Sequence, residues 1–144
     1  MILLDAYALV ALLGDEPPAA EVAALLDEGE CAMTAVNLAE VVDVAGRTGR
    51  LEPGELRDLV GTLAVSGRLR VLTVGEDSVW RAGDLRGKHY ANKSSELSLA
   101  ACFLLGSAGP DDAIATADAP VARAARAEGI PIVALSSSSG RRPE

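Results

Sequence analysis

Three acidic residues stand where the sequence could bring carboxylates close together. Asp5 ends the apolar run MILLD, and Asp118 follows the apolar run AIAT within the segment TAD. Glu40 lies in AVNLAEVVDVAGR, a segment with few polar side chains. Each acid could instead have a plain structural role, since Asp5 and Asp118 could cap the following helices and Glu40 could be a solvated surface residue. Oxygen ligands without His or Cys suit a hard divalent cation, so together the acids predict a site for Mg²⁺ or Mn²⁺.

Hydrolysis of a phosphodiester in a nucleic acid is the reaction that best matches these acids. A hard divalent cation can activate water and stabilise the charge that develops on a phosphate. The glycine-rich patterns GxxxxGK[ST] and GxGxxG are absent, which disfavours nucleotide hydrolases and dinucleotide enzymes. The net charge of −8 argues against a broad electrostatic surface for nucleic acid. It does not exclude an enzyme that reaches nucleic acid through metal ions, because bound cations can invert the local field.

The remaining chemistry-bearing residues point away from other kinds of site. Cys31 and Cys102 are isolated among apolar residues and are expected to be small buried hydrophobes rather than a disulfide or zinc site. The single histidine, His89, lies in a polar stretch and is not expected to be catalytic. No apolar run approaches the roughly 18 residues that cross a membrane, and no basic segment precedes the first apolar run. We therefore expect a cytoplasmic protein with no membrane partner.

Five apolar runs separated by helical segments predict the elements that position the acids. The expected strands are MILL (1–4), CAMT (31–34), RVLTV (70–74), AIAT (113–116) and PIVAL (131–135). The expected helices span 6–14, 35–49, 51–67, 76–87, 98–108 and 119–129. This order predicts an α/β fold, a single doubly wound domain over residues 1–135 with a central five-stranded parallel sheet. Residues 136–144 are predicted to be a disordered tail. Ligands of such sheets bind outside the carboxyl ends of the strands, where two of the acids lie.

Polar side chains on the helix 35–49 have a regular spacing. Asn37, Glu40, Asp43 and Arg47 are three, three and four residues apart, so they are expected to form one stripe. The other residues are mostly Ala, Val and Leu, which predicts that the helix is largely buried. The stripe would then face water, a groove or a partner.

Several segments in a fixed order resemble a known family. LLDAYALVALL, TAVNLAEVVDVAGR and the stretch from SLAAC through AIATADAPVARAARAEGIPIVAL resemble a PIN domain, and most of all the VapC-type toxins of bacterial toxin–antitoxin pairs. The resemblance runs from about Ile2 to Leu135. It implies a compact α/β fold (PIN-like) and a Mg²⁺- or Mn²⁺-dependent endoribonuclease. It also implies an RNA substrate, an antitoxin protein as partner and a homodimer.

The resemblance assigns roles to individual residues. The family's metal-binding acids fall on Asp5, Glu40 and Asp118, and a polar residue that assists them falls on Thr116. The family places a further acid in the helix motif LSLADC. Here the motif reads LSLAAC, with Ala101 at the position of the acid. As written, the chain is therefore expected to be weak or inactive as a ribonuclease.

Three explanations of the alanine remain open. It could be a deliberate substitution, because Ala removes the carboxylate and favours the helix. It could mark a naturally degenerate family member that binds an antitoxin or RNA without cutting. Alternatively Glu96, five residues earlier, could compensate, although it would lie on another part of the helix and could simply favour the helix dipole.

Two further predictions concern the surroundings of this helix. Leu99, Phe103, Leu104 and Leu105 are expected to be packing residues. Basic side chains that precede the helix could contact RNA phosphates near the strand ends, or be ordinary solubilising charges; these are Arg81, Arg86, Lys88 and Lys93. A receiver-type signalling domain also has five parallel strands, but RVLTVGED has no acid directly at the end of the third strand.

Overall fold

Short apolar segments form a fully parallel five-stranded sheet, which confirms the predicted fold class. A computed structural model describes residues 1–90 and 97–144. The strands in chain order are β1 (Ile2–Leu4), β2 (Cys31–Thr34), β3 (Leu69–Leu72), β4 (Ala113–Thr116) and β5 (Ile132–Ala134). Their order across the sheet is β3-β2-β1-β4-β5. The chain builds outward from β1 on one side and then returns to build on the other, so the topological switch point lies between β1 and β4.

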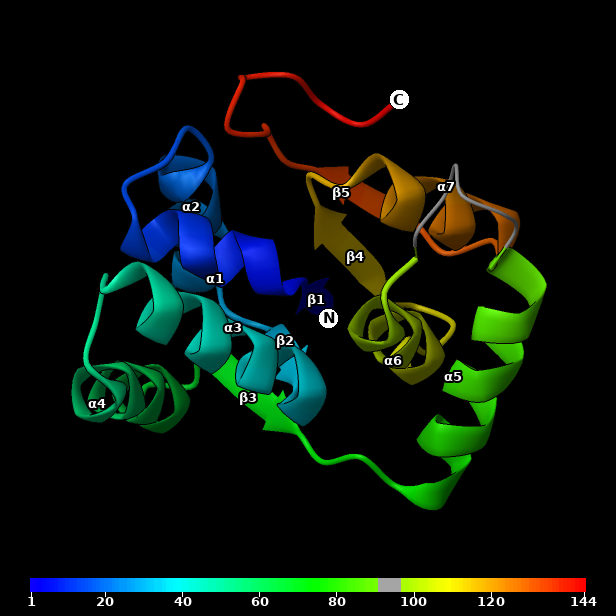
Figure 1. Cartoon of the computed structure of the whole chain (residues 1–144), viewed down its shortest axis with the longest axis horizontal. Coiled ribbons are helices and arrows are strands. Elements are labelled where there is room, and N and C mark those ends of the chain that lie inside the picture. Colours follow the sequence, from blue (N-terminus) through cyan, green and yellow to red (C-terminus); the bar gives the residue numbers. More distant parts are fainter. Residues whose placement is uncertain (91–96) are drawn as a thin grey trace.

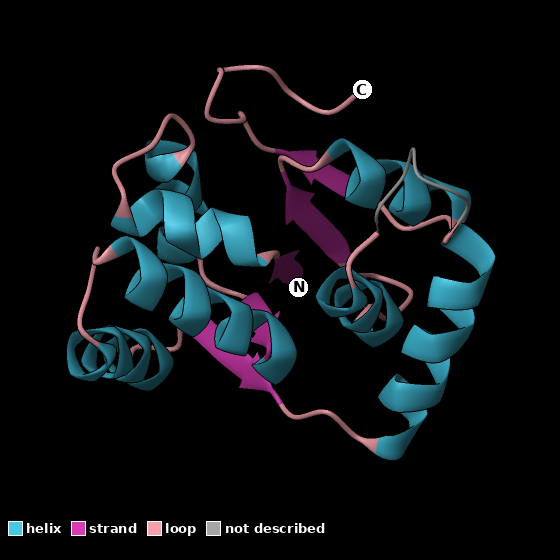
Figure 2. Ribbon diagram, in the orientation of Figure 1, coloured by secondary structure: helices cyan, strands magenta, loops and turns pink. Residues whose placement is uncertain are grey.

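Seven helices in the described residues cover the two faces of the sheet (Figures 1 and 2). They are α1 (Ala6–Leu13), α2 (Ala19–Glu28), α3 (Ala35–Thr48), α4 (Pro53–Val65), α5 (Glu76–His89), α6 (Leu99–Ser107) and α7 (Ala119–Ala127). Helices α1 to α4 share a hydrophobic core with Leu4 and Met33, whereas α5 to α7 share a second core with Leu3 and Ala32. Successive strand residues point to opposite faces, and this alternation explains the two cores. Continuous apolar strands are what a sheet covered on both faces requires.

Helix α2 was not predicted from the sequence. Its segment, AAEVAALLDE, buries only one narrow side, chiefly Val22 and Leu26, against the first core. Pro17 and Pro18 stand directly before it and read as a loop. The helix packs on α1, and its segment is rich in Ala, Leu and Glu, which are strong helix formers, so the sequence did carry a helical signal here.

Two expectations about buried faces are wrong. On α3 only Asn37, Val41 and Ala45 are buried, while Asp43 and Arg47 form an exposed ion pair at 2.8 Å. The predicted polar stripe is therefore buried at Asn37 and exposed at its other end, and most of the helix surface is open. On α6 Leu99 is 51% exposed, because it begins the helix outside the second core. The other three predicted packing residues of α6 do belong to that core or pack against it.

Other features of the described chain agree with the sequence. Cys31 and Cys102 are buried, as predicted. Within residues 1–90 and 97–144 no helix has the length and apolar character needed to cross a membrane. Residues 136–144 form no helix or strand and pass back over the molecule from β5 (Figure 1). The predicted disorder of this tail stays a prediction.

Candidate active site

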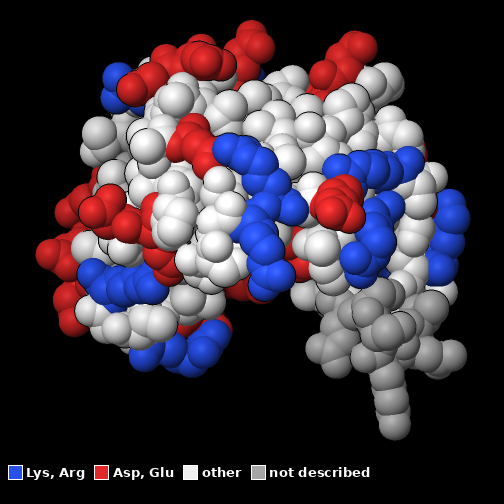
Figure 3. All heavy atoms as spheres, turned by 90° about the horizontal axis from the view of Figure 1, so that it is seen from above, with Lys and Arg blue, Asp and Glu red and all other residues white. Residues whose placement is uncertain are grey.

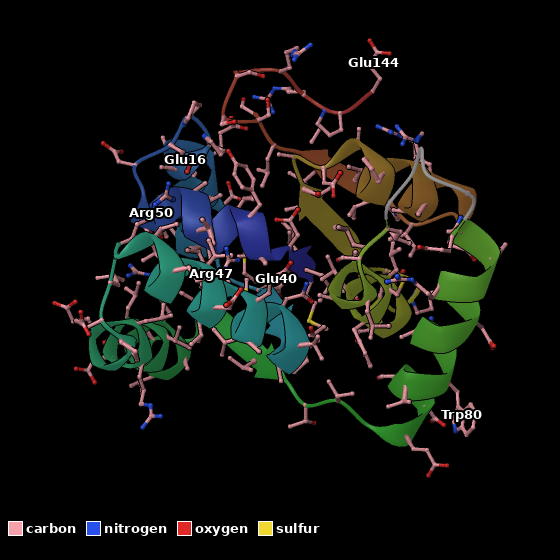
Figure 4. The ribbon with its side chains drawn as sticks, in the orientation of Figure 1. Glu16, Glu40, Arg47, Arg50, Trp80 and Glu144 are labelled. Carbon is pink, nitrogen blue, oxygen red and sulfur yellow. The ribbon has the colours of Figure 1, made fainter. Side chains whose placement is uncertain are left out.

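A small cavity of about 100 Å³ lies at the carboxyl ends of β1 and β4, at the switch point of the sheet. Three acids from three separate elements line it, together with the alanine of α6. The lining residues are Asp5, Ala6, Tyr7, Asn37, Glu40, Ser98, Ala101, Asp118 and Val121. The structure thus brings together the residues that the sequence singled out one by one. Figure 4 shows Glu40 near the centre of the molecule, where α1 and α3 approach each other.

Asp5 occupies the floor of this cavity and is only 7% exposed. Its Oδ1 accepts a hydrogen bond from the backbone N–H of Ala8 at 2.9 Å and so caps α1. Its Oδ2 accepts a hydrogen bond from the Thr116 hydroxyl. The capping role and the predicted site role therefore coincide in one carboxylate.

Thr116 links two of the acids. Besides donating to Asp5, its Oγ1 accepts a hydrogen bond from the backbone N–H of Asp118 at 3.0 Å. Thr116 is fully buried at the end of β4, next to β1 in the sheet. A fixed threonine in this place holds the Asp5 side chain in one orientation and shapes the turn that leads to Asp118.

The three acids share an unfavourable electrostatic environment. Burial raises the pKa of Asp5 to about 6, and the charges of Asp118 and Glu40 add to the effect while its hydrogen bonds oppose it. Burial also raises the pKa of Glu40, with contributions from Asp43 and Asp118. The pKa of Asp118 is raised by partial burial of its carboxyl group, although Arg123 counteracts this. Neighbouring carboxylates with raised pKa values are typical of a functional site, such as one that binds a cation.

Ala101 forms part of the cavity wall and is 6% exposed. Its backbone N–H donates to the side chain of Ser98 at 3.0 Å, which is the N-cap of α6. An aspartate here would bring a fourth carboxylate to the same cavity. Glu96, the residue considered as a replacement, lies outside the described residues.

The donors around the cavity suit a hard divalent cation in kind, because all are oxygen atoms. They are not assembled into a tight group, however. Within the described residues no three His, Cys, Asp or Glu side chains gather closely enough to hold a metal ion. Ala101 lines the same cavity with an apolar methyl group. That Asp5, Glu40 and Asp118 hold a metal ion, and that position 101 lacks a ligand, stay predictions.

Several residues of the cavity were not expected from the sequence. Tyr7 donates its hydroxyl hydrogen bond to Glu16 at 2.8 Å, and burial followed by this bond raises its pKa to about 12. Asn37 is buried and accepts a hydrogen bond from the Thr34 hydroxyl. Ser98 could have been recognised, since a Ser directly before an apolar helical segment is a common helix-capping signal. Tyr7 and Val121 have no such local signal.

The predicted RNA-contacting residues lie elsewhere. Arg81 and Lys88 line a separate cavity with Gly109 and Pro131, the residues that lead into β4 and β5. This places them beside the amino ends of those strands, whereas the carboxylates lie at the carboxyl ends. Lys88 also forms an ion pair with Glu128 at 2.7 Å.

The other two members of this basic group differ from each other. Arg86 stacks over the ring of Tyr90, with 4.6 Å between the guanidinium carbon and the ring centre. Lys93 lies outside the described residues. An RNA contact by any of the four residues stays a prediction.

Solved structures of low sequence identity share this fold. A toxin–antitoxin complex from Klebsiella pneumoniae matches with a TM-score of 0.59 and 16% identity, covering 82% of this chain and 87% of that one. FitAcB from Neisseria gonorrhoeae matches with a TM-score of 0.61 and 21% identity, covering 92% and 96%. DNA-bound VapBC from Salmonella typhimurium matches with a TM-score of 0.60 and 18% identity, also covering 92% and 96%.

Sequence comparison adds a family. The model of the PIN domain family matches residues 2–135, which is nearly the whole chain. No curated protein sequence matches this chain. The matched range includes every residue of the carboxylate cavity.

Proposed function

This chain belongs to the PIN domain family, and from that premise we propose that it is a Mg²⁺- or Mn²⁺-dependent endoribonuclease toxin in which Ala101 suppresses catalysis. One observation carries the proposal: acids from β1, α3 and the end of β4 converge on one cavity at the switch point of the sheet. The toxin assignment is supported by neighbours described as a toxin–antitoxin complex and as VapBC. On this proposal an antitoxin protein is the partner, RNA is the substrate and the toxin works as a cytoplasmic homodimer.

Each residue of the cavity has a distinct role in this proposal. Asp5, Glu40 and Asp118 would hold the cation, and Thr116 keeps Asp5 in position through its hydroxyl hydrogen bond. When bound, the cation supplies an activated water and a positive charge opposite the phosphate. The buried position of Asp5 excludes water from one side of the site and strengthens every charge interaction within it.

Ala101 is the residue that decides whether the site is active. It lines the cavity with a methyl group where the family has a carboxylate, so one ligand position is empty of donors. We expect the chain as written to cleave RNA weakly or not at all. Ala101→Asp should restore metal-dependent cleavage, because aspartate supplies the missing oxygen donors.

The test is cleavage of total RNA with added Mg²⁺ or Mn²⁺. The matched control is Ala101→Asn, which has nearly the same shape but no charge, and a second control adds Asp5→Asn to the restored protein. Cleavage by Ala101→Asp alone, abolished by EDTA, is the expected result. Strong cleavage by the unaltered chain would show that residue 101 is not a ligand position.

The alternative function is a binding module without catalysis, which the alanine itself favours. Such a module would hold an antitoxin or RNA through the same fold. RNA or antitoxin binding by the unaltered chain, together with no cleavage after Ala101→Asp, would favour this alternative. An aspartate codon in the natural gene would favour the toxin, and an upstream antitoxin gene would identify the partner.

A further inference from the structure

A second cavity of about 450 Å³ is lined by arginines and by residues next to Asp118 in the chain. Its residues come from the end of β4, from α7 and from the C-terminal tail: Ala117, Ala119, Arg123, Ser137, Arg141, Arg142, Pro143 and Glu144. Ala117 and Ala119 flank Asp118, which lines the carboxylate cavity. Residues of one short turn, 117–119, therefore line both cavities. We call the second one the arginine cavity.

Positive charge at this place is notable in a chain of net charge −8. Figure 3 views the side of the molecule on which the C-terminal end lies, and Lys and Arg side chains gather in the middle of that face. Acidic side chains lie mostly around them. The basic area is thus local, and it lies over the part of the molecule that the tail crosses (Figure 1).

Specific contacts hold the tail in this position. Ser136 donates a hydrogen bond to Glu21 of α2 at 2.7 Å, and Arg142 forms an ion pair with the same carboxylate at 2.9 Å. The backbone N–H of Ser137 donates to the carbonyl of Arg141 at 2.6 Å, which closes a turn. These contacts bring the tail arginines back toward α7.

The arginines of the cavity differ in how far their charge is already neutralised. Arg142 is paired with Glu21. In the part of the chain that the structure describes, Arg123 and Arg141 have no carboxylate within 4.0 Å. Glu144 lines the same cavity and can compete for both arginines, and the charge of Arg123 also acts on Asp118.

We propose that the arginine cavity binds a backbone phosphate of the nucleic acid, held by Arg123 and Arg141. The guanidinium group is a planar fork of donors that matches phosphate oxygens, and it stays charged at all working pH values. A strand whose reacting phosphate lies at the carboxylates would place a neighbouring phosphate beside the turn that contains Asp118. The inference rests on the proposed function, since it gives the substrate of that site a second point of attachment.

Binding of a labelled single-stranded RNA oligonucleotide, followed by fluorescence anisotropy in EDTA, tests this inference without cleavage. Arg123→Gln and Arg141→Gln should each weaken binding about tenfold at low salt, the size expected for a hydrogen-bonded ion contact. Each should also lower the slope of log affinity against log salt by about 1. Glu144→Gln should tighten binding, because it removes the competing carboxylate.

Arg57→Gln is the matched control, because Arg57 is exposed on α4 and lines neither cavity. It should change the affinity far less than the two cavity variants. Arg141 lies on the tail outside both cores, so its variant stays informative even if Arg123→Gln fails to fold. Equal affinities for Arg141→Gln, Arg123→Gln and Arg57→Gln would overturn the inference. So would arginine-dependent binding of acidic peptides without binding of RNA.

Cleavage by Ala101→Asp separates this inference from the proposed function. If that variant cleaves RNA and Arg141→Gln does not weaken binding, the arginine cavity has no role and the function stands. If Ala101→Asp does not cleave and no form of the protein binds RNA, both proposals fall. Cleavage together with weakened binding in the arginine variants supports both.

Discussion

Asp5 combines a structural and a chemical role in one side chain. One of its oxygen atoms caps α1 and the other is held by Thr116, so the carboxylate cannot turn away from the cavity. The same burial that fixes it makes its charged form costly. Its neutral form is therefore favoured in the folded protein near pH 6 and below when no cation is present.

The raised pKa of Asp5 predicts a pH-dependent effect of Asp5→Asn. In the folded protein the pKa is about 6, against a usual value of 3.8. The unfolded state therefore ionises first as the pH rises, and the contribution of Asp5 to the stability of the unaltered protein falls between about pH 4 and pH 6. Asparagine removes this loss. Above pH 6 the free energy of unfolding of the variant should therefore exceed that of the unaltered protein by up to about 3 kcal/mol, and below pH 4 there should be no such gain.

Urea unfolding in EDTA at several pH values measures this difference. Asp58→Asn, at an exposed position on α4 that lines neither cavity, serves as the control. A stability gain for Asp5→Asn that is equal at pH 4 and pH 7.5 would contradict the electrostatic explanation.

A carboxylate at position 101 should destabilise the metal-free protein. Asp would be nearly buried in a cavity where the acids already repel one another. The thermal midpoint of Ala101→Asp in EDTA is expected to be several degrees below that of the unaltered chain, and added Mg²⁺ should reverse part of the loss. Ala101→Asn separates charge from shape. An Asp variant as stable as the unaltered chain in EDTA would refute the repulsion.

At the scale of elements, β1 and β4 decide the site. They are neighbours in the sheet, with Leu4 aligned to Ala115, so the residues that follow each strand meet at one edge. The sequence indicated both strands and both strand ends correctly. The prediction missed α2, whose segment is nevertheless rich in strong helix formers, and it missed the exposure of Leu99 at the first turn of α6.

The junction after α1 provides a test of packing between elements. A Cβ at Gly14 would lie 2.3 Å from Nη1 of Arg50, whose guanidinium pairs with Glu16 at 2.7 Å and donates to the carbonyl of Val10 at 3.2 Å. Figure 4 shows Arg50 and Glu16 close together at this end of α1. Gly14→Ala should displace the guanidinium, which is the far end of a flexible side chain, and cost up to about 1 kcal/mol in unfolding free energy.

Two comparisons sharpen this measurement. Gly61 lies inside α4, and a Cβ added there would meet no atom within 4 Å. Gly61→Ala should therefore stabilise the protein by about 0.5 to 1 kcal/mol. In a protein that already carries Arg50→Ala, the cost of Gly14→Ala should largely vanish. An additive double variant would show that the clash with Arg50 is not the cause.

At the scale of the whole molecule, the excess of acidic residues should make stability depend on salt. With a net charge of −8 at neutral pH, the folded chain repels itself, and salt screens this repulsion. Raising KCl from about 0.05 to 0.3 M should raise the thermal midpoint at pH 7.5. Near pH 4.5, where many carboxylates are protonated, the gain should be much smaller. A midpoint that falls with salt at pH 7.5 would indicate that ion pairs outweigh the net repulsion.

The fold class, the approximate positions of the strands, the family and the unusual alanine could all be predicted before the structure was known. These properties depend on local patterns: apolar runs, the acids that end them and short motifs. The folded structure was needed to show that Asp5 and Thr116, 111 residues apart, share a hydrogen bond, and that the tail arginines line one cavity with Ala117 and Ala119. Contacts between distant segments follow from strand order and packing, which no local pattern encodes. For the same reason the pKa of Asp5 could be assigned only once its surroundings were known.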